Sequence, residues 1–152
     1  MDFLSHFIWA YVLFRHEPWL WVGVAFCLVP DILWFVPMAG RRYVLRHEIT
    51  FKDVQSYYRA SHSLVTVSAA YAVVLALFGG STAFAVAAGW LLHFLMDVWT
   101  HKGGIVQGIA PFYPLSNWRS PALFWWSEQI QRRPWLYAAN LAAAVAVYLL
   151  AA

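Results

Sequence analysis

Four histidines and two aspartates stand within or at the ends of strongly apolar segments: His6, Asp31, His62, His93, Asp97 and His101. Ionisable side chains are costly in such surroundings and usually serve a function. His93 and Asp97 are four residues apart, so a helix would stack them on one face, and His101 continues that stripe if the helix persists. Imidazole and carboxylate groups together bind zinc, manganese or iron. The set predicts a divalent metal site.

The number of ions is open at this stage, because six candidate ligands exceed the needs of one tetrahedral ion. Two ions sharing Asp97 as a bridging carboxylate would activate a water and stabilise charge on a phosphate or carbonyl oxygen. One ion, with the other residues orienting its ligands, is the alternative. A simple His93–Asp97 hydrogen bond between buried polar groups is the plainest interpretation of that pair.

The chemistry of the donor set favours a catalytic site. Cys27 is the only cysteine and lies in an apolar run, so no cluster of thiolates is available. All-N/O ligand sets are more typical of catalytic than of structural zinc. We expect one or two divalent ions, zinc first and manganese second, with Asp31 and Asp97 as the catalytic carboxylates.

Composition places these residues in a membrane protein. The chain has 152 residues, of which 62% are hydrophobic and 11% charged, whereas a soluble domain is about 45–50% apolar and about 25% charged. Stretches such as Ser63–Gly80 and Leu136–Ala152 contain no Lys, Arg, Asp or Glu. We therefore expect an all-α protein, with residues 1–152 forming a single membrane-embedded domain, a polytopic bundle of about four to five transmembrane helices.

The apolar segments and their breaks can be placed along the chain. The expected membrane segments are Phe3–Phe14, Trp19–Val36, His62–Phe78, Thr82–Trp99 and Pro134–Ala151, and a more polar amphipathic stretch lies near Glu48–Ala60. Breaks are expected at Glu17-Pro18, at Pro37 with Gly40, at Gly79-Gly80 and across Gly103–Pro121. The first segment is short for a span. Ser61 is expected to cap a helix, and Gly103–Pro121 to form an ordered cover.

Charge then orients the bundle. If every segment crosses, one side carries Arg41, Arg42, Arg46, Lys52, Arg59, Lys102, Arg119, Arg132 and Arg133, and the other carries only Arg15. The positive-inside rule places the first side and the N-terminus in the cytoplasm. The same topology brings all six candidate ligands toward the cytoplasmic face. The orientation rests on Lys and Arg residues and the convergence on His and Asp residues, so the two arguments are independent. Since orientation explains the basic residues, nucleic acid is not an expected partner.

Two basic residues adjoin candidate ligands. Arg59 precedes Ser61 and His62, and Lys102 follows His101. Both are predicted to bind an anionic substrate near the metal. Anchoring to lipid headgroups is an equally good interpretation.

Short motifs around these residues resemble a known family, the YdjM-type inner-membrane metal-dependent hydrolases. The resemblance extends through about Ser120 and rests on these motifs: Asp2–Phe7, Leu28–Asp31, Ala60–Leu64, Trp90–Asp97 with Thr100-His101, and Pro111–Ser116. It implies a multi-pass protein of a bacterial-type inner membrane.

A more distant resemblance concerns the order of the ligands. His6, Asp31, His62 and then His93-x-x-x-Asp97 are similar to the zinc ligands of bacterial zinc-dependent phospholipase C and nuclease P1. By that resemblance Asp31, His62, His93 and Asp97 would hold one ion, and His6 with Asp97 would contribute to another. Those enzymes have a further His and a His-x-x-x-Glu pair downstream, which this chain lacks after His101. The departure argues against a trinuclear site.

The expected function is therefore metal-dependent hydrolysis. A metal-activated water would attack an ester, such as a phosphoester of a lipid or lipid-linked substrate entering from the bilayer. The alternative is a non-catalytic membrane protein whose metal serves stability, sensing or partner recruitment. Membrane lipid is the expected partner, and a homo-oligomer is compatible with the Ala-rich Ala138–Ala146 stretch.

Overall fold

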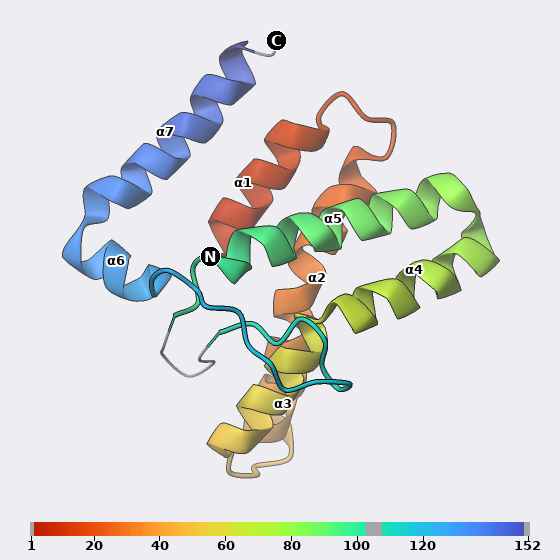
Figure 1. Ribbon diagram of the computed structural model, residues 1–152, viewed down its shortest axis with the longest axis vertical. Coiled ribbons are helices and arrows are strands. Elements are labelled where there is room, and N and C mark those ends of the chain that lie inside the picture. Colours follow the sequence, from red (N-terminus) through yellow and green to blue (C-terminus); the bar gives the residue numbers. More distant parts are fainter. Residues whose placement is uncertain (1, 103–107, 151–152) are drawn as a thin grey trace.

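The computed structural model describes residues 2–102 and 108–150, and these ranges consist of helices and their connections (Figure 1). The elements are α1 (Phe3–Phe14), α2 (Leu20–Ala39), the π-helical turn η1 (Gly40–Val44), α3 (Phe51–Ser61), α4 (Leu64–Phe78), α5 (Gly80–Val98), α6 (Trp126–Arg132) and α7 (Pro134–Leu150). Within the described ranges β structure amounts to one isolated bridge, His101 to Trp125. The all-α prediction is confirmed.

Local sequence explains where the site-bearing helices begin. The Asp2 carboxylate accepts a hydrogen bond from the Ser5 backbone N–H and caps α1. Ser63, rather than Ser61, caps α4 by accepting from the Val65 N–H, so the prediction for Ser61 was wrong. Ser61 is the last residue of α3, and its hydroxyl bonds back to the Tyr58 carbonyl instead. The short α3–α4 break leaves His62 between two capped helices.

Helix α2 runs further than the sequence indicated. The break expected at Pro37 with Gly40 corresponds to the end of α2 at Ala39, after which the chain continues from Gly40 in the wider π-helical turn η1. Pro37 removes one backbone donor, but the Gly40 N–H bonds to the carbonyls of Val36 and Pro37 and keeps the chain coiled. Asp31 consequently lies near the middle of a long helix rather than near its end.

Fewer helices than expected have the length of a membrane span. The segments Leu20–Val44 and Gly80–Val98 are long and apolar enough to cross, and α3 with α4 would add a third only as one span bent by 50°. Helix α1 has 12 residues, which is about 18 Å against a hydrocarbon core of about 30 Å. Helix α7, with 17 residues, is also short. These lengths do not confirm a bundle of four to five spans.

Helices α2 and α5 pack closely together. A Cβ added at Gly89 would collide with the carbonyl oxygen of Gly23 and lie 3.0 Å from the backbone nitrogen of Cys27. Gly89 therefore lets the two backbones approach more closely than another residue would. One turn beyond Gly89, His93 uses this proximity to contact the backbone of α2.

Helices α1 and α7 lie side by side and run in the same direction (Figure 1). The Tyr137 hydroxyl donates to Asp2 at one end of the pair, and the Arg15 guanidinium donates to the Tyr148 carbonyl at the other. This parallel arrangement is what an odd number of intervening crossings would produce.

The connection between α5 and α6 packs against the site-bearing helices. Residues 103–107 of the expected cover lie outside the described residues, whereas 108–125 are described. Ile109 is fully buried against Tyr58 and Phe94, and the Leu64 N–H at the start of α4 donates to the Pro111 carbonyl.

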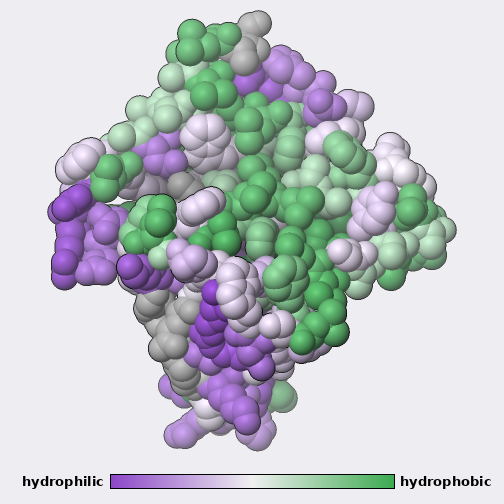
Figure 2. Space-filling view, in the orientation of Figure 1, coloured by the Kyte–Doolittle hydropathy of each residue, from purple (hydrophilic) through white to green (hydrophobic). Residues whose placement is uncertain are grey.

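The surface is divided by polarity. Figure 2 shows hydrophilic residues gathered over α3 and near the α6–α7 corner, while apolar residues cover α4, α5 and α7.

Candidate metal centre

All six predicted ligands meet in one place. His6 comes from α1, Asp31 from α2, His62 from the break between α3 and α4, His93 and Asp97 from α5, and His101 from just beyond α5. Five of them are almost completely buried, and only the Asp31 side chain is partly accessible, at 22%. Asp97 lies at the centre, 1% exposed, within 3.5 Å of nitrogens from all four histidines.

The Oδ2 side of Asp97 brings three ligand atoms together, with Asp31 at the edge of the group. The Nε2 atoms of His62 and His93 each lie 3.2 Å from Asp97 Oδ2, and they lie 2.9 Å from one another. Asp31 Oδ1 is 4.0 and 3.9 Å from these two nitrogens. Ligands about 2.0–2.1 Å from one tetrahedral zinc are about 3.4 Å apart. The observed separations surround that value.

Backbone carbonyls determine which ring nitrogens face this centre. His93 Nδ1 lies 2.7 Å from the carbonyl oxygen of Cys27, and His62 Nδ1 lies 3.0 Å from that of Tyr58. A carbonyl oxygen only accepts, so His93 Nδ1 carries the proton and its Nε2 presents a lone pair in the neutral ring. His62 Nδ1 also lies 2.8 Å from the Ser61 hydroxyl, which bonds to the same Tyr58 carbonyl. Two ring nitrogens and a carboxylate therefore converge, an arrangement in which histidines bind metal ions.

The Oδ1 side of Asp97 faces His6. His6 Nε2 is 3.2 Å from Asp97 Oδ1, and its Nδ1 is 3.6 Å from Asp31 Oδ2. Neither nitrogen forms a hydrogen bond among the described residues, although the ring is fully buried and stacked on His93 at 3.9 Å. A buried polar atom without a partner costs about 1–3 kcal/mol. Both nitrogens thus sit beside carboxylates in an arrangement that a bound cation would satisfy.

No protein-family model, curated protein or solved structure matches this chain. Function must therefore be inferred from the geometry of its own residues. Two groups have ligand atoms within 4.8 Å of one another, His6 with Asp31 and His93, and His62 with His93 and Asp97. These buried groups could hold a metal ion.

His101 lies beside Asp97 but outside both groups. Its Nδ1 is 3.1 Å from the Asp97 carbonyl oxygen and 3.5 Å from Oδ1. Burial lowers the pKa of His101 to about 3, although the Asp97 charge acts in the opposite direction, so the ring is neutral near pH 7. His101 thus contacts the Asp97 backbone and lies beside its carboxylate, and direct ligation by His101 stays a prediction.

Tyr58 belongs to the site but was missed by the sequence reasoning. Its ring is 3% exposed and stacks on His62 with centroids 3.8 Å apart. The hydroxyl is buried, interacts electrostatically with Asp97 and forms no hydrogen bond among the described residues. Tyr58 stands four residues before His62, so the helical spacing was a signal that could have found it.

A cavity opens at the Asp31 edge of the cluster. It measures about 270 Å³ and is lined by Asp2, Phe3, Asp31, Ile32, Trp34, Phe35 and Trp126. Phe3, Ile32 and Phe35 are each more than 40% exposed, so this approach lies on an apolar part of the surface. The cluster is therefore closed on most sides and accessible at one carboxylate.

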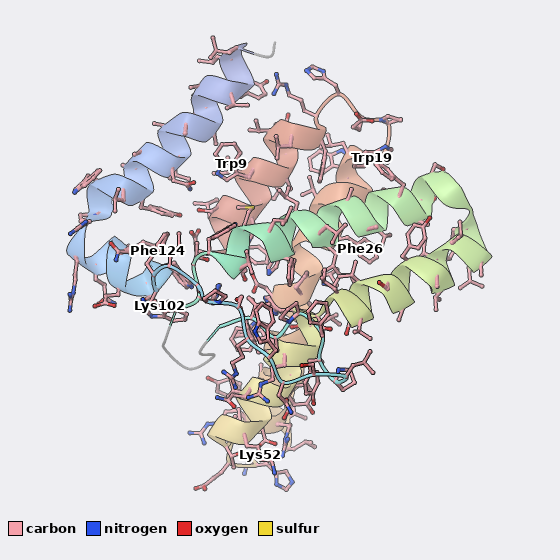
Figure 3. All side chains as sticks on the ribbon, viewed as in Figure 1. Trp9, Trp19, Phe26, Lys52, Lys102 and Phe124 are labelled. Carbon is pink, nitrogen blue, oxygen red and sulfur yellow. The ribbon has the colours of Figure 1, made fainter. Side chains whose placement is uncertain are left out.

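The two predicted substrate-binding residues lie elsewhere. The Arg59 guanidinium bonds to Gln55 and Asn117, between α3 and the 108–125 connection. Lys102 is exposed beside Phe124, near the start of α6 (Figure 3). Other residues line the cavity at Asp31, so contact of Arg59 or Lys102 with a substrate stays a prediction.

A polar network ties α7 to the end of α1 that carries His6. Asn140 accepts from the Trp9 indole and donates to the Ser5 hydroxyl, which itself donates to Asp2. Burial would raise the pKa of the Asp2 carboxyl, but hydrogen bonds from Ser5 and Tyr137 outweigh it and hold that pKa below its usual value. Asn140, a lone polar residue in an apolar segment, was the available sequence signal.

Proposed function

We propose that the protein is a membrane-embedded, metal-dependent hydrolase acting on an ester of a lipid or lipid-linked substrate, with a phosphoester as the favoured group. Zinc is the expected ion and manganese the alternative, since all the donors are nitrogen or oxygen. When bound, the metal would activate a water and stabilise negative charge developing on the substrate oxygen.

The observation that carries this proposal is the convergence of ring nitrogens at Asp97. The His62 and His93 Nε2 atoms are 2.9 Å apart, and the Nδ1 atom of each ring lies within hydrogen-bond distance of a backbone carbonyl. A proton shared between these two rings would relieve that pair alone, because both His6 nitrogens would still form no hydrogen bond among the described residues, although each lies beside a carboxylate oxygen. Divalent cations bound at Asp97 would give a partner both to the His62 and His93 nitrogens beside Oδ2 and to the His6 nitrogen beside Oδ1.

The ligand set divides naturally around Asp97. Asp31, His62, His93 and Asp97 Oδ2 form the better set for a first ion, and His6 with Asp97 Oδ1 would contribute to a second. Asp97 then bridges, with the His101 Nδ1 atom 3.5 Å from its Oδ1 atom. One ion with His6 as an orienting residue requires fewer ligands and is the simpler version of the same proposal.

Asp31 is assigned a second role, in proton transfer. It is the one member of the cluster whose side chain is substantially accessible, and it lines the adjoining cavity. A carboxylate at that edge can accept a proton from an attacking water while the buried residues stay fixed. The open edge supports catalysis over a purely structural ion, whose coordination sphere is usually closed.

The cavity also supports a substrate delivered from the bilayer, because its mouth is surrounded by exposed Phe3, Ile32 and Phe35. We place the protein in a bacterial-type inner membrane, with the site and the N-terminus toward the cytoplasm. The two helices long enough to span support a membrane location, while the inner membrane is what the resemblance of the YdjM-type motifs implies and the orientation rests on the basic residues. Arg59 and Lys102 are assigned to an anionic substrate portion or to lipid headgroups.

Metal content and hydrolysis in detergent-purified protein test the proposal. Elemental mass spectrometry should find one or two equivalents in the wild type and a loss of metal in the His93→Ala/Asp97→Ala double variant. His47→Ala, which removes an exposed histidine, is the matched control and should keep its metal. Folded wild-type protein that stays metal-free after incubation with zinc and manganese would overturn the proposal.

A non-catalytic metal protein is the second candidate, favoured by the nearly complete burial of His6, His62, His93, Asp97 and His101. The two candidates differ in turnover. A chromogenic phosphodiester with a long alkyl chain, presented in mixed micelles, should be hydrolysed by the metal-loaded wild type and not by Asp31→Asn that still contains metal. Metal-loaded protein without turnover on any ester or phosphoester of this class supports the second candidate.

A further inference from the structure

A second and larger cavity adjoins the one at Asp31. It measures about 470 Å³ and lies between α6, α7, the end of the 108–125 connection and the start of α1. Its lining residues are Asp2, Thr100, Phe124, Trp126, Gln129, Ile130, Arg133, Leu136, Tyr137 and Asn140. The volume is within the range of about 300–1,000 Å³ that is typical of ligand sites.

The polar residues of this cavity are largely committed to one another. Asp2 accepts from the Ser5 hydroxyl and the Tyr137 hydroxyl, and Asn140 is bonded to Trp9 and Ser5. Satisfied polar groups do not require a polar ligand. The surfaces left for an occupant are the apolar side chains of Phe124, Trp126, Ile130 and Leu136.

The two cavities meet at Asp2 and Trp126, which line both of them. A molecule lying in the larger cavity would therefore point past these residues toward Asp31, the accessible edge of the metal centre. Figure 3 shows Phe124 and Lys102 close together beside α6, so the wall of the larger cavity lies next to the segment that follows His101.

The outer rim of the larger cavity matches a lipid–water boundary. Leu123, Trp135 and Leu136 are exposed apolar residues around α6 and α7, and Trp is enriched at the level of the lipid headgroups. Arg133, at the α6–α7 turn, adds an exposed cation at the cavity lining. An apolar interior suits the acyl chain of a phospholipid, and a cation at the rim suits its anionic headgroup.

We propose that the cavity between α6 and α7 binds the acyl chain of an anionic phospholipid and so holds the substrate of the metal centre by its apolar part. That the bound lipid is a substrate rests on the proposed function, whereas the binding of the lipid in the cavity does not depend on it. Trp126 and Asp2 mark the passage from chain to ester, and Arg133 faces the headgroup region.

Lipid binding to delipidated protein in detergent tests the cavity directly. Dioleoyl phosphatidylglycerol is titrated, and bound lipid is counted by native mass spectrometry. Ile130→Trp should fill the cavity and weaken binding at least about tenfold, with Leu136→Trp as a second filling variant. Leu149→Trp, at an exposed position of α7 outside the lining, is the matched control and should bind as the wild type does.

A short-chain probe separates the chain from the headgroup. Dihexanoyl phosphatidylglycerol keeps the headgroup but loses most methylenes, so it should bind at least about tenfold more weakly than the dioleoyl lipid. Equal binding of the two lipids, or wild-type binding by both filling variants in folded form, would overturn the cavity assignment. Metal content is measured on the same samples after incubation with zinc and manganese, so lipid binding by wild type that stays metal-free would overturn the proposed function and leave the cavity assignment standing.

Discussion

At the residue scale, the centre is organised by groups that the metal would not touch. The carbonyl of Cys27 fixes the tautomer of His93, because a carbonyl accepts and never donates, and the Tyr58 carbonyl lies 3.0 Å from His62 Nδ1. The sequence could identify the histidines from their apolar surroundings. It could not identify these carbonyls, because every residue has a backbone carbonyl and its type does not tell which one contacts a histidine.

Asp97→Asn tests the role assigned to the central carboxylate. The amide keeps the shape but removes the charge shared by both sides of the cluster, so metal affinity should fall by more than about 100-fold, the upper range for changes to orienting residues. Zinc should raise the melting temperature of the wild type and not that of the variant. Isothermal titration and thermal melts give the two measurements.

Glu128→Gln is the control for the aspartate change. Glu128 is 46% exposed and pairs with Arg132 on α6, so the same chemical change there should leave zinc affinity within about twofold of the wild type. If Asp97→Asn retained wild-type affinity as well, Asp97 would not be a ligand.

At the scale of elements, the helix boundaries followed from the sequence more closely than the connections did. Phe3–Phe14 was predicted with the observed bounds because an unbroken apolar run defines it. Helix α6 was missed because its seven residues carry no periodic signal. Helix α2 extends past the predicted end at Val36, where the Gly40 N–H bonds to the carbonyls of Val36 and Pro37.

Gly89→Ala tests whether the close α2–α5 contact positions the site. The added Cβ would collide with the Gly23 carbonyl and separate the helices that carry Asp31 and His93. Overpacking of this kind costs about 1–3 kcal/mol, so we expect a lower melting temperature together with weaker zinc binding.

Gly80→Ala provides the comparison on the same helix. A Cβ at Gly80 meets nothing within 4 Å, and alanine favours a helix by about 1 kcal/mol over glycine. Its stability should equal or exceed that of the wild type, with unchanged zinc binding. Equal behaviour of the two variants in thermal melts and zinc titration would show that the Gly89 contact does not position the ligands.

At the scale of the whole molecule, the meeting of six separated residues could be predicted, whereas the accessible edge could not. The Lys and Arg residues assigned each end of the apolar segments to one side of the membrane, and the six histidines and aspartates lay near ends assigned to the same side. Which carboxylate stayed accessible depended on how α6 and the 108–125 connection packed, and that depends on contacts such as Ile109 with Tyr58. The predicted number of spans also exceeded the number of helices with sufficient length.

Accessibility of single cysteines to a membrane-impermeant maleimide tests the proposed topology. In a Cys27→Ala background, Glu17→Cys should be labelled from outside intact inner-membrane spheroplasts. His47→Cys should be labelled only after permeabilisation, since the basic loops face the cytoplasm. Labelling of both positions from the same side would contradict the assigned orientation and the crossing between them.

X-ray absorption at the zinc edge of zinc-loaded wild-type protein tests the central claim most directly. The account predicts tightly bound zinc with about four nitrogen and oxygen ligands at about 2.0–2.1 Å, including the outer-shell signal of imidazoles. A sulfur neighbour at about 2.3 Å, which would have to come from Cys27, or the failure of folded protein to retain zinc would contradict it.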